Sequence, residues 1–202
     1  MKSCVIGRGD DGFAANATGK MADWEGGTSM ILGLFETHID VADLERSCRF
    51  YGETLGLQLG VLDQERRAAF YWVGPRGQAM LGLWEKPAAQ IRPQHFAFRA
   101  SIEDVLTRAV PYLKERGLQP SNFLHDGTER PMVFGWMPAL AIYFRDPDGH
   151  SLEFIAMLPD EPHPEVNVVS WDAWQRLYRR EASGHSSMRP PGAGSALPRI
   201  RM

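Results

Sequence analysis

The chain has 202 residues, of which 44% are hydrophobic and 23% are charged. This composition is ordinary for a globular protein, and the length suffices for one domain or two very small ones. The formal net charge of −3 gives no electrostatic reason to expect binding to nucleic acid or to an anionic membrane.

The sequence lacks the features of membrane and secreted proteins. No apolar run approaches the roughly 20 residues that a membrane-spanning helix needs. The N-terminus has no apolar core of the kind that a secretory signal carries. The two cysteines, Cys4 and Cys48, do not make a disulfide framework. We therefore expect a reduced, cytoplasmic protein.

The two ends of the chain differ from its middle. Residues 1–29 are rich in small and polar residues without an apolar period, which predicts a disordered leader and makes Met30 a candidate for the true start. Residues 184–202 are rich in Ser, Pro and Gly and predict a solvated tail.

A strand–helix–three-strand unit opens the ordered part. Residues 37–41 read as a strand, and Asp43 is placed to cap a helix that Gly56 ends. The helix has an apolar face that comprises Leu44, Cys48, Tyr51 and Leu55. Further strands are expected at about residues 57–62, 67–73 and 79–85.

The same plan repeats from residue 94. Residues 94–98 are strand-like, and Ser101 with Asp104 forms a capping-box pattern before a second helix. Pro111 inside the apolar stripe of that helix predicts a kink or a broken turn. Further strands are expected at about residues 118–123, at 132–144 with a break near Pro138, and at 150–157. The run Asp146-Pro147-Asp148-Gly149 predicts a turn before the last strand.

A proline-rich stretch at residues 159–164 leads to one more helix, which Ser170 can cap. Its apolar face carries Trp171, Trp174, Leu177 and Tyr178, and two tryptophans on a short helix indicate docking on the domain or on a partner. The predicted organisation is a leader (1–29), a domain (30–159) with modules at about 34–86 and 93–158, a linker with a docking helix (160–183), and a tail (184–202).

A candidate metal site emerges from the repeat. His38 and His95 occupy equivalent places, near the start of the opening strand of each unit. Glu153 lies on the closing strand of the second unit, facing away from its apolar neighbours. A structural role is the commoner one for a histidine in a strand, but the symmetry favours ligands. Two imidazoles and a carboxylate from three strands can bind a divalent metal and leave open positions.

The doubled plan resembles the vicinal oxygen chelate superfamily, which includes glyoxalase I, fosfomycin-resistance proteins, extradiol dioxygenases and bleomycin-binding proteins. Four runs carry the resemblance: residues 37–41 (THIDV), 50–57 (FYGETLGL), 94–98 (QHFAF) and 143–153 (YFRDPDGHSLE). It implies an α+β fold in which two βαβββ modules form an open, curved mixed sheet, a glyoxalase-like barrel, with a C-terminal helix added. His38, His95 and Glu153 match the family's ligands, so we expect Mn, Fe, Ni, Co or Zn.

Asp40 and Tyr143 each have two alternative roles. Asp40 shares a face with His38, where it is either a catalytic base or hydrogen-bond partner, or a solvated residue at a strand end. Tyr143 matches a tyrosine that lines the substrate site in several branches of the family, with core packing as the alternative. We expect exposure for His125, His150 and His163, and core packing for Trp72, Trp84 and Trp136.

The sequence departs from each named branch of the family. Gly82 stands where glyoxalase I has a fourth ligand, a glutamate, and Glu85 should face the other way. Residues 130–137 lack the histidine that extradiol dioxygenases need, and the chain is too short for their second pair of modules. Asp40 stands where fosfomycin thiol transferases have a threonine.

We therefore expect a metal-dependent glyoxalase-family enzyme that acts on a small organic substrate by chelation and proton transfer or nucleophilic addition, as a lyase, isomerase or detoxifying transferase. The alternatives are an extradiol-type dioxygenase, a metal-free drug-binding protein of the bleomycin-resistance kind, and an interaction protein centred on the tryptophan helix. In relatives the modules often pair between chains, and the tryptophan helix adds apolar surface. Both features predict a homodimer.

Overall fold

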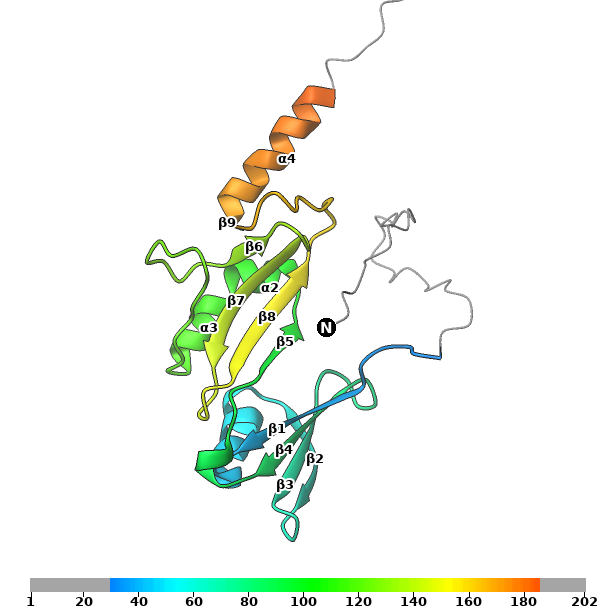
Figure 1. Cartoon of the computed structure of the whole chain (residues 1–202), viewed down its shortest axis with the longest axis vertical. Coiled ribbons are helices and arrows are strands. Elements are labelled where there is room, and N and C mark those ends of the chain that lie inside the picture. The colour runs from blue at the N-terminus through cyan, green and yellow to red at the C-terminus, as the bar shows by residue number, and fades with distance from the viewer. Residues whose placement is uncertain (1–29, 186–202) are drawn as a thin grey trace, which may run out of the picture.

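The computed structural model describes residues 30–185, and within residues 179–185 it describes the backbone only. The expected leader with Cys4, and the expected tail from residue 186 onward, lie outside the described residues. Two βαβββ modules, one added strand and a C-terminal helix follow one another along the described part (Figure 1). None of the helices in this part is long and apolar enough to cross a membrane. The expected α+β class is confirmed.

The first module is a four-stranded sheet with a helix on one face. Its elements are β1 (Glu36–Val41), α1 (Leu44–Cys48) continued by a π-helical segment (Arg49–Thr54), β2 (Gln58–Asp63), β3 (Ala68–Trp72) and β4 (Met80–Glu85). The strand order is β1-β4-β3-β2, with β1 parallel to β4 and the other neighbours antiparallel. The predicted strands of this module agree closely with these bounds.

The second module repeats the plan in a five-stranded sheet of order β5-β8-β7-β6-β9. Its elements are β5 (His95–Arg99), α2 (Ile102–Thr107), α3 (Ala109–Glu115), β6 (Met132–Phe134), β7 (Ala139–Arg145), β8 (Ser151–Met157) and β9 (Val168–Ser170). The expected strand at 118–123 is wrong, since only Ser121 forms a bridge, to Tyr143. Pro120 has no N–H for a strand ladder. The expected break near Pro138 separates β6 from β7.

Local interactions decide where the helices begin and end. The side chains of Asp43 and Ser101 cap α1 and α2, each by accepting a hydrogen bond from a backbone N–H in the first turn. Gly56 ends the first helical region with a φ of +74°, which favours glycine. Pro111 has no N–H to donate to the preceding turn. The expected helix is broken in that preceding turn, at Arg108, which separates α2 from α3, and Pro111 itself lies in α3.

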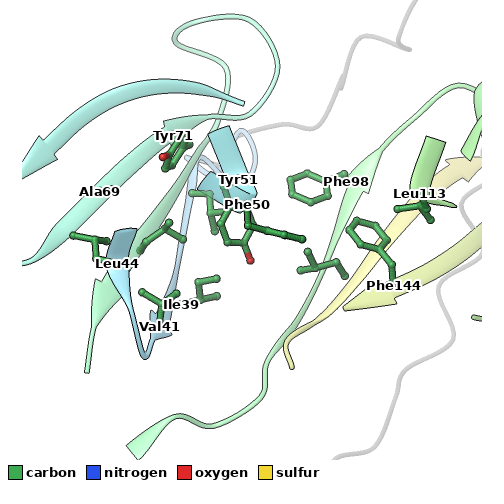
Figure 2. Packing of buried hydrophobic residues seen from close by; sticks show 13 residues of the cluster. Ile39, Val41, Leu44, Phe50, Tyr51, Ala69, Tyr71, Phe98, Leu113 and Phe144 are labelled. Carbon is green, nitrogen blue, oxygen red and sulfur yellow. The ribbon is translucent and has the colours of Figure 1, made fainter. Parts of the chain in front are cut away.

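The two sheets are separate, and their helix-covered faces share one core. Figure 2 shows Phe50 and Tyr51 of the π-helical segment between the first sheet and the second module, where Phe98 of β5, Leu113 of α3 and Phe144 of β7 lie. The face of each sheet without helices is therefore turned away from this shared core. The modules of one chain are joined through their helical sides, and the strands of residues 30–185 form two separate sheets and no continuous barrel.

A polar turn fixes one module on the other. Within the turn, the backbone N–H of Gly149 donates to the carbonyl of Asp146 over 3.1 Å, as its sequence predicts. The hydroxyl of Tyr51, from the first module, donates to the buried carboxylate of Asp146 over 2.9 Å. Arg46, also from the first module, forms an ion pair with Asp148. The turn thus fastens the second sheet to the helix of the first.

His150 completes this joint between the modules, and its expected exposure is wrong because the residue is 0% exposed. Its Nε2 lies 2.8 Å from the carbonyl oxygen of Asp40, and its Nδ1 accepts from the N–H of Gln94 over 3.0 Å. A carbonyl oxygen only accepts, so Nε2 carries the proton and the neutral ring is fully hydrogen-bonded. His150 therefore ties the end of β1 to the residue before β5.

The C-terminal extension packs on the second module. Strand β9 pairs with β6, and α4 (Trp171–His185) follows directly. Trp174 is 1% exposed, belongs to the core cluster under α2, and donates from Nε1 to the carboxylate of Asp160 over 2.6 Å. The helix thus docks on its own domain, one of the two expected roles. Its far end runs away from the sheet in Figure 1.

Candidate metal centre

The expected ligands lie on the helix-free faces of the two sheets. On β1, Ile39 is buried while the neighbouring His38 is exposed and Asp40 is half-buried, as strand alternation requires. On β8, Leu152 joins the shared core and Glu153 lies on the opposite face. The sequence pattern therefore predicted the facing of these side chains.

His95 and Glu153 form a close pair on the second sheet. Their strands are parallel neighbours, and His95 Nε2 lies 3.2 Å from Glu153 Oε2. Tyr143 on β7 is the register partner of Glu153 and stacks on the His95 ring with the ring centroids 5.5 Å apart. Tyr143 is 8% exposed, so it is packed as well as close to the pair. Three of the expected site residues therefore meet here.

The hydrogen bond on the far side of the His95 ring sets its tautomer. His95 Nδ1 lies 2.9 Å from the carbonyl oxygen of Ser151, which only accepts, so Nδ1 carries the proton. In the neutral ring, Nε2 then directs a lone pair at the carboxylate of Glu153. Two lone-pair atoms at this distance repel each other unless a cation, either a proton or a metal ion, lies between them. This is the arrangement in which proteins present histidine to metals.

Glu153 is buried, and the protein satisfies only part of its hydrogen-bonding capacity. It is 3% exposed, and its Oε1 is buried without a hydrogen-bond partner among the described residues. Burial raises the pKa of this carboxyl group, and the neighbouring Tyr143 hydroxyl and His95 ring, which favour the ionised form, do not offset it. A buried carboxylate oxygen without a partner is costly, and a bound cation would remove that cost. The donor set therefore fits a divalent metal.

A second histidine–carboxylate pair lies on the first sheet. His38 Nε2 is 3.0 Å from Glu36 Oε1, and the indole N–H of Trp84 donates to His38 Nδ1 over 3.3 Å. Because Trp84 only donates, Nδ1 accepts and the proton of the neutral ring is on Nε2, directed at Glu36. His38 and Asp40 are thus on one face, as expected, but on a different sheet from His95.

Neither candidate on β4 supplies a further ligand. Gly82 is the register partner of His38, and a Cβ at Gly82 would lie 2.6 Å from the His38 ring, so the ring occupies the space that a side chain would need. Glu85 faces the helix, as expected: it accepts from the N–H of Leu44 over 2.8 Å and forms an ion pair with Arg67.

The two pairs do not meet within one chain. The described residues contain no group of three or more His, Cys, Asp and Glu side chains that could hold a metal ion. Within the described part, β1 pairs only with β4 and β5 only with β8, so each of these strands leaves one edge open. The strands that carry His38 and His95 are therefore both edge strands.

Two residues beside His38 were missed by the sequence reasoning. Glu36 lies two positions before His38 on β1, and strand alternation could have found it. Trp84 is the register partner of Asp40, which only knowledge of the β1–β4 pairing could reveal.

Some expectations for other aromatic residues are wrong. Trp136 is 57% exposed, not packed in the core, while Trp72 and Trp84 are half-buried outside the core clusters. His163 packs edge-on against Trp174 and Tyr178, so it is not a solvated loop residue. His125 is exposed, as expected.

Comparison with known proteins identifies the family. A model of the Glyoxalase/Bleomycin resistance protein/Dioxygenase superfamily matches residues 33–154, which is more than half of the chain. The chain belongs to this superfamily. The matched region runs from residue 33, before β1, to residue 154, within β8, so it contains all the candidate ligands and excludes β9 and α4.

Individual proteins and solved structures are similar to about two thirds of the chain. The uncharacterized protein YraH of Bacillus subtilis is 28% identical over 134 residues, covering 62% of this chain and 98% of YraH. The integron cassette protein HFX_CASS4, from the mobile metagenome of a Halifax Harbour sewage outfall, is 36% identical with a TM-score of 0.54 and covers 63% of this chain and all of that one. A Nocardioides glyoxalase/bleomycin resistance protein/dioxygenase has 24% identity and a TM-score of 0.50, covering 67% of this chain and 89% of its own, which shows the fold.

Proposed function

We propose that this chain is a divalent-metal-dependent enzyme of the superfamily that acts on a small organic substrate. His95 and Glu153 of one chain would hold the ion, which is Mn, Fe, Ni, Co or Zn, together with His38 of a second copy. The observation that carries the proposal is the His95–Glu153 pair, in which an imidazole lone pair faces a buried carboxylate with one unpartnered oxygen. Imidazole and carboxylate donors suit these ions.

The single chain has two features that support a site shared between copies. Its described residues bring no three donors together, and the strands that carry His38 and His95 are open edges. Open edge strands favour association with another chain. In a two-fold dimer with β1 of one chain beside β5 of the other, both edges are covered and two equivalent sites form.

The residues around such a site would have different roles, in orienting the ligands and in proton transfer. A bound divalent ion supplies Lewis acidity that polarises vicinal oxygen atoms of the substrate. Ser151 fixes the His95 ring through its carbonyl oxygen, and Tyr143 stacks on that ring and restricts its movement. Asp40 lies on the same face as His38 and takes the proton from the substrate as general base.

The proposed reaction is of the lyase, isomerase or detoxifying-transferase type. The dioxygenase alternative has no candidate histidine in residues 130–137. The metal-free binding alternative is favoured by one observation, the aromatic surface beside His38. Phe70 packs edge-on against Trp84 with ring centroids 5.7 Å apart, and both lie on the helix-free face of the first sheet, where a planar drug could stack.

Metal analysis of the purified full-length chain tests the proposal. We expect about one divalent ion per chain, in a dimer by light scattering at micromolar concentration. His95→Ala and Glu153→Gln should each weaken the metal affinity at least about 100-fold, because loss of even an outer-shell partner costs about 10- to 100-fold. His125→Asn, at an exposed loop position, is the control and should have no effect. Parent-like affinity and stoichiometry in both ligand variants would contradict the proposal.

A further inference from the structure

The two histidine–carboxylate pairs have the same composition and nearly the same spacing. His38 Nε2 lies 3.0 Å from Glu36 Oε1, and His95 Nε2 lies 3.2 Å from Glu153 Oε2. In each pair, the other ring nitrogen is hydrogen-bonded to a neutral group of the protein. Bonds from nitrogen and oxygen ligands to a metal such as zinc are about 2.0–2.2 Å long, so donors with this separation can both reach one ion. In the second pair the unprotonated Nε2 of His95 already faces the carboxylate, whereas in the first pair the proton of the His38 ring must move from Nε2 to Nδ1 before Nε2 binds an ion.

Glu36 supplies a carboxylate beside His38 on the helix-free face of the first sheet. It precedes His38 by two residues on β1, so both side chains emerge on the helix-free face. Gly82, opposite His38, has no side chain to offer, and Glu85 is engaged on the other face by Arg67. The first sheet thus presents a carboxylate beside its histidine from β1 instead of from β4.

We propose that Glu36 is a fourth protein ligand of the metal and replaces the glutamate that Gly82 lacks. The inference rests on the proposed function, since the ion is the one held there by His38 together with His95 and Glu153 of the second copy. The donor set then has two imidazoles and two carboxylates. Two carboxylates balance the charge of a divalent ion, which lowers the cost of placing that ion beside a carboxylate as buried as Glu153.

Two other roles for Glu36 make different predictions. As a mere hydrogen-bond acceptor from His38 Nε2, Glu36 competes with the metal for that nitrogen, so its removal raises the metal affinity. As a nearby charge without direct contact, Glu36 attracts the ion from a distance, so its removal lowers the affinity slightly and leaves the ion's ligands unchanged. As a ligand, its removal lowers the affinity and also changes the absorption spectrum of a coloured ion.

Titration of the metal-free full-length chain with Co²⁺, followed by visible absorption and by competition with a chelator, separates these roles. The test variant is Glu36→Gln, which is nearly isosteric and lies at an exposed strand start. The matched control is Glu53→Gln, which removes the same charge from an exposed position in the π-helical segment. We expect Glu36→Gln to bind Co²⁺ at least about tenfold more weakly, with an altered absorption band, and Glu53→Gln to stay within about twofold of the parent.

Equal or tighter Co²⁺ binding by Glu36→Gln would overturn the ligand role, and so would weaker binding with an unchanged absorption band. His95→Ala, titrated in parallel, distinguishes this result from a failure of the proposed function. If His95→Ala loses Co²⁺ while Glu36→Gln binds like the parent, the function stands and Glu36 is not a ligand. If the parent itself binds no Co²⁺, both ideas are wrong.

Discussion

The two halves of the proposed centre differ in how far the protein prepares them for an ion. On the second sheet, Glu153 is 3% exposed and the His95 ring already presents an unprotonated Nε2. On the first sheet, the Glu36 side chain is 37% exposed and His38 Nε2 carries the proton of the neutral ring, because Trp84 donates to Nδ1. The two imidazole rings are exposed to a similar degree, 46% for His38 and 49% for His95, so the two halves differ in the burial of the carboxylate and in the ring tautomer. The His95–Glu153 pair, the buried half, therefore needs no rearrangement to bind an ion. The His38–Glu36 pair with Asp40, the exposed half, must lose the hydrogen bond from Trp84 before His38 binds a metal through Nε2.

This difference assigns separate tasks to the two halves. An oriented donor pair with a buried carboxylate loses little conformational freedom when it binds an ion, so we expect this pair to set the metal affinity of the proposed centre. An exposed half can change its hydrogen bonds as substrate and metal arrive, so it suits proton transfer. Four variants, from the largest expected effect to the smallest, test whether metal affinity and proton transfer are divided between the two halves in this way.

Asp40→Asn tests the catalytic task of the exposed half. The change removes the proposed base and keeps a polar side chain of nearly the same shape, so turnover should fall by about 10²- to 10⁴-fold. Metal content and substrate affinity should stay close to the parent. Glutathione hemithioacetals, epoxides and catechols are the substrates to assay, with Asp63→Asn on β2 as control. If turnover stays within about threefold of the parent, Asp40 is not the base.

His150→Ala tests the joint that holds the two halves of one chain. The buried ring bonds both Asp40 and Gln94, so its loss leaves two backbone groups unpaired and opens a cavity. The free energy of unfolding should fall by about 2–4 kcal/mol, measured by urea denaturation of the metal-free chain. The exposed His125→Asn serves as control. A loss below about 0.5 kcal/mol would show that the joint does not depend on His150.

Glu153→Gln separates binding from stability in the buried half. Burial raises the pKa of Glu153 because the charged form is poorly solvated, so a neutral amide should suit the metal-free protein better. The amide can also donate to the lone pair of His95 Nε2. The free energy of unfolding of the metal-free variant, measured by thermal unfolding, should be about 1 kcal/mol higher than that of the parent. The variant should also bind the metal more weakly. A destabilised metal-free variant would show that the carboxylate is already satisfied without an ion.

Trp84→Phe tests the hydrogen bond that the exposed half must give up. Without the indole donor, the proton of the His38 ring is free to move to Nδ1, which leaves Nε2 for the metal. The metal affinity should rise by about two- to fivefold, the equivalent of about 0.5–1 kcal/mol. Trp136→Phe, at an exposed position, is the matched control. Weaker binding by Trp84→Phe would mean that the indole supports the ligand instead of competing with it.

The sequence contained most of the fold. Strand alternation, the cap residues Asp43 and Ser101, and the break at Pro111 are local features, and all of them appear in the structure. The strand predicted at 118–123 failed because its pattern ignored Pro120. The exposure predicted for His150 failed because the acceptors that bury this turn residue come from distant parts of the chain.

The candidate site could be predicted only in part. Alternation put His38 with Asp40, and Glu153 opposite its apolar neighbours, because facing depends on the strand itself. The meeting of His95, Glu153 and Tyr143 also follows from pairing within one module. No pattern along a single chain states which copy supplies His38, because that depends on how the open edges of β1 and β5 are covered.

Complementation between two defective chains tests the shared centre most directly. His38→Ala and His95→Ala, each as a homodimer, should bind metal weakly. A heterodimer of the two, isolated with different tags, has one site with both lesions and one site with neither if ligands come from both copies. It should therefore bind about one ion per dimer with the parent's affinity. A heterodimer that binds as weakly as the two homodimers would contradict a shared centre.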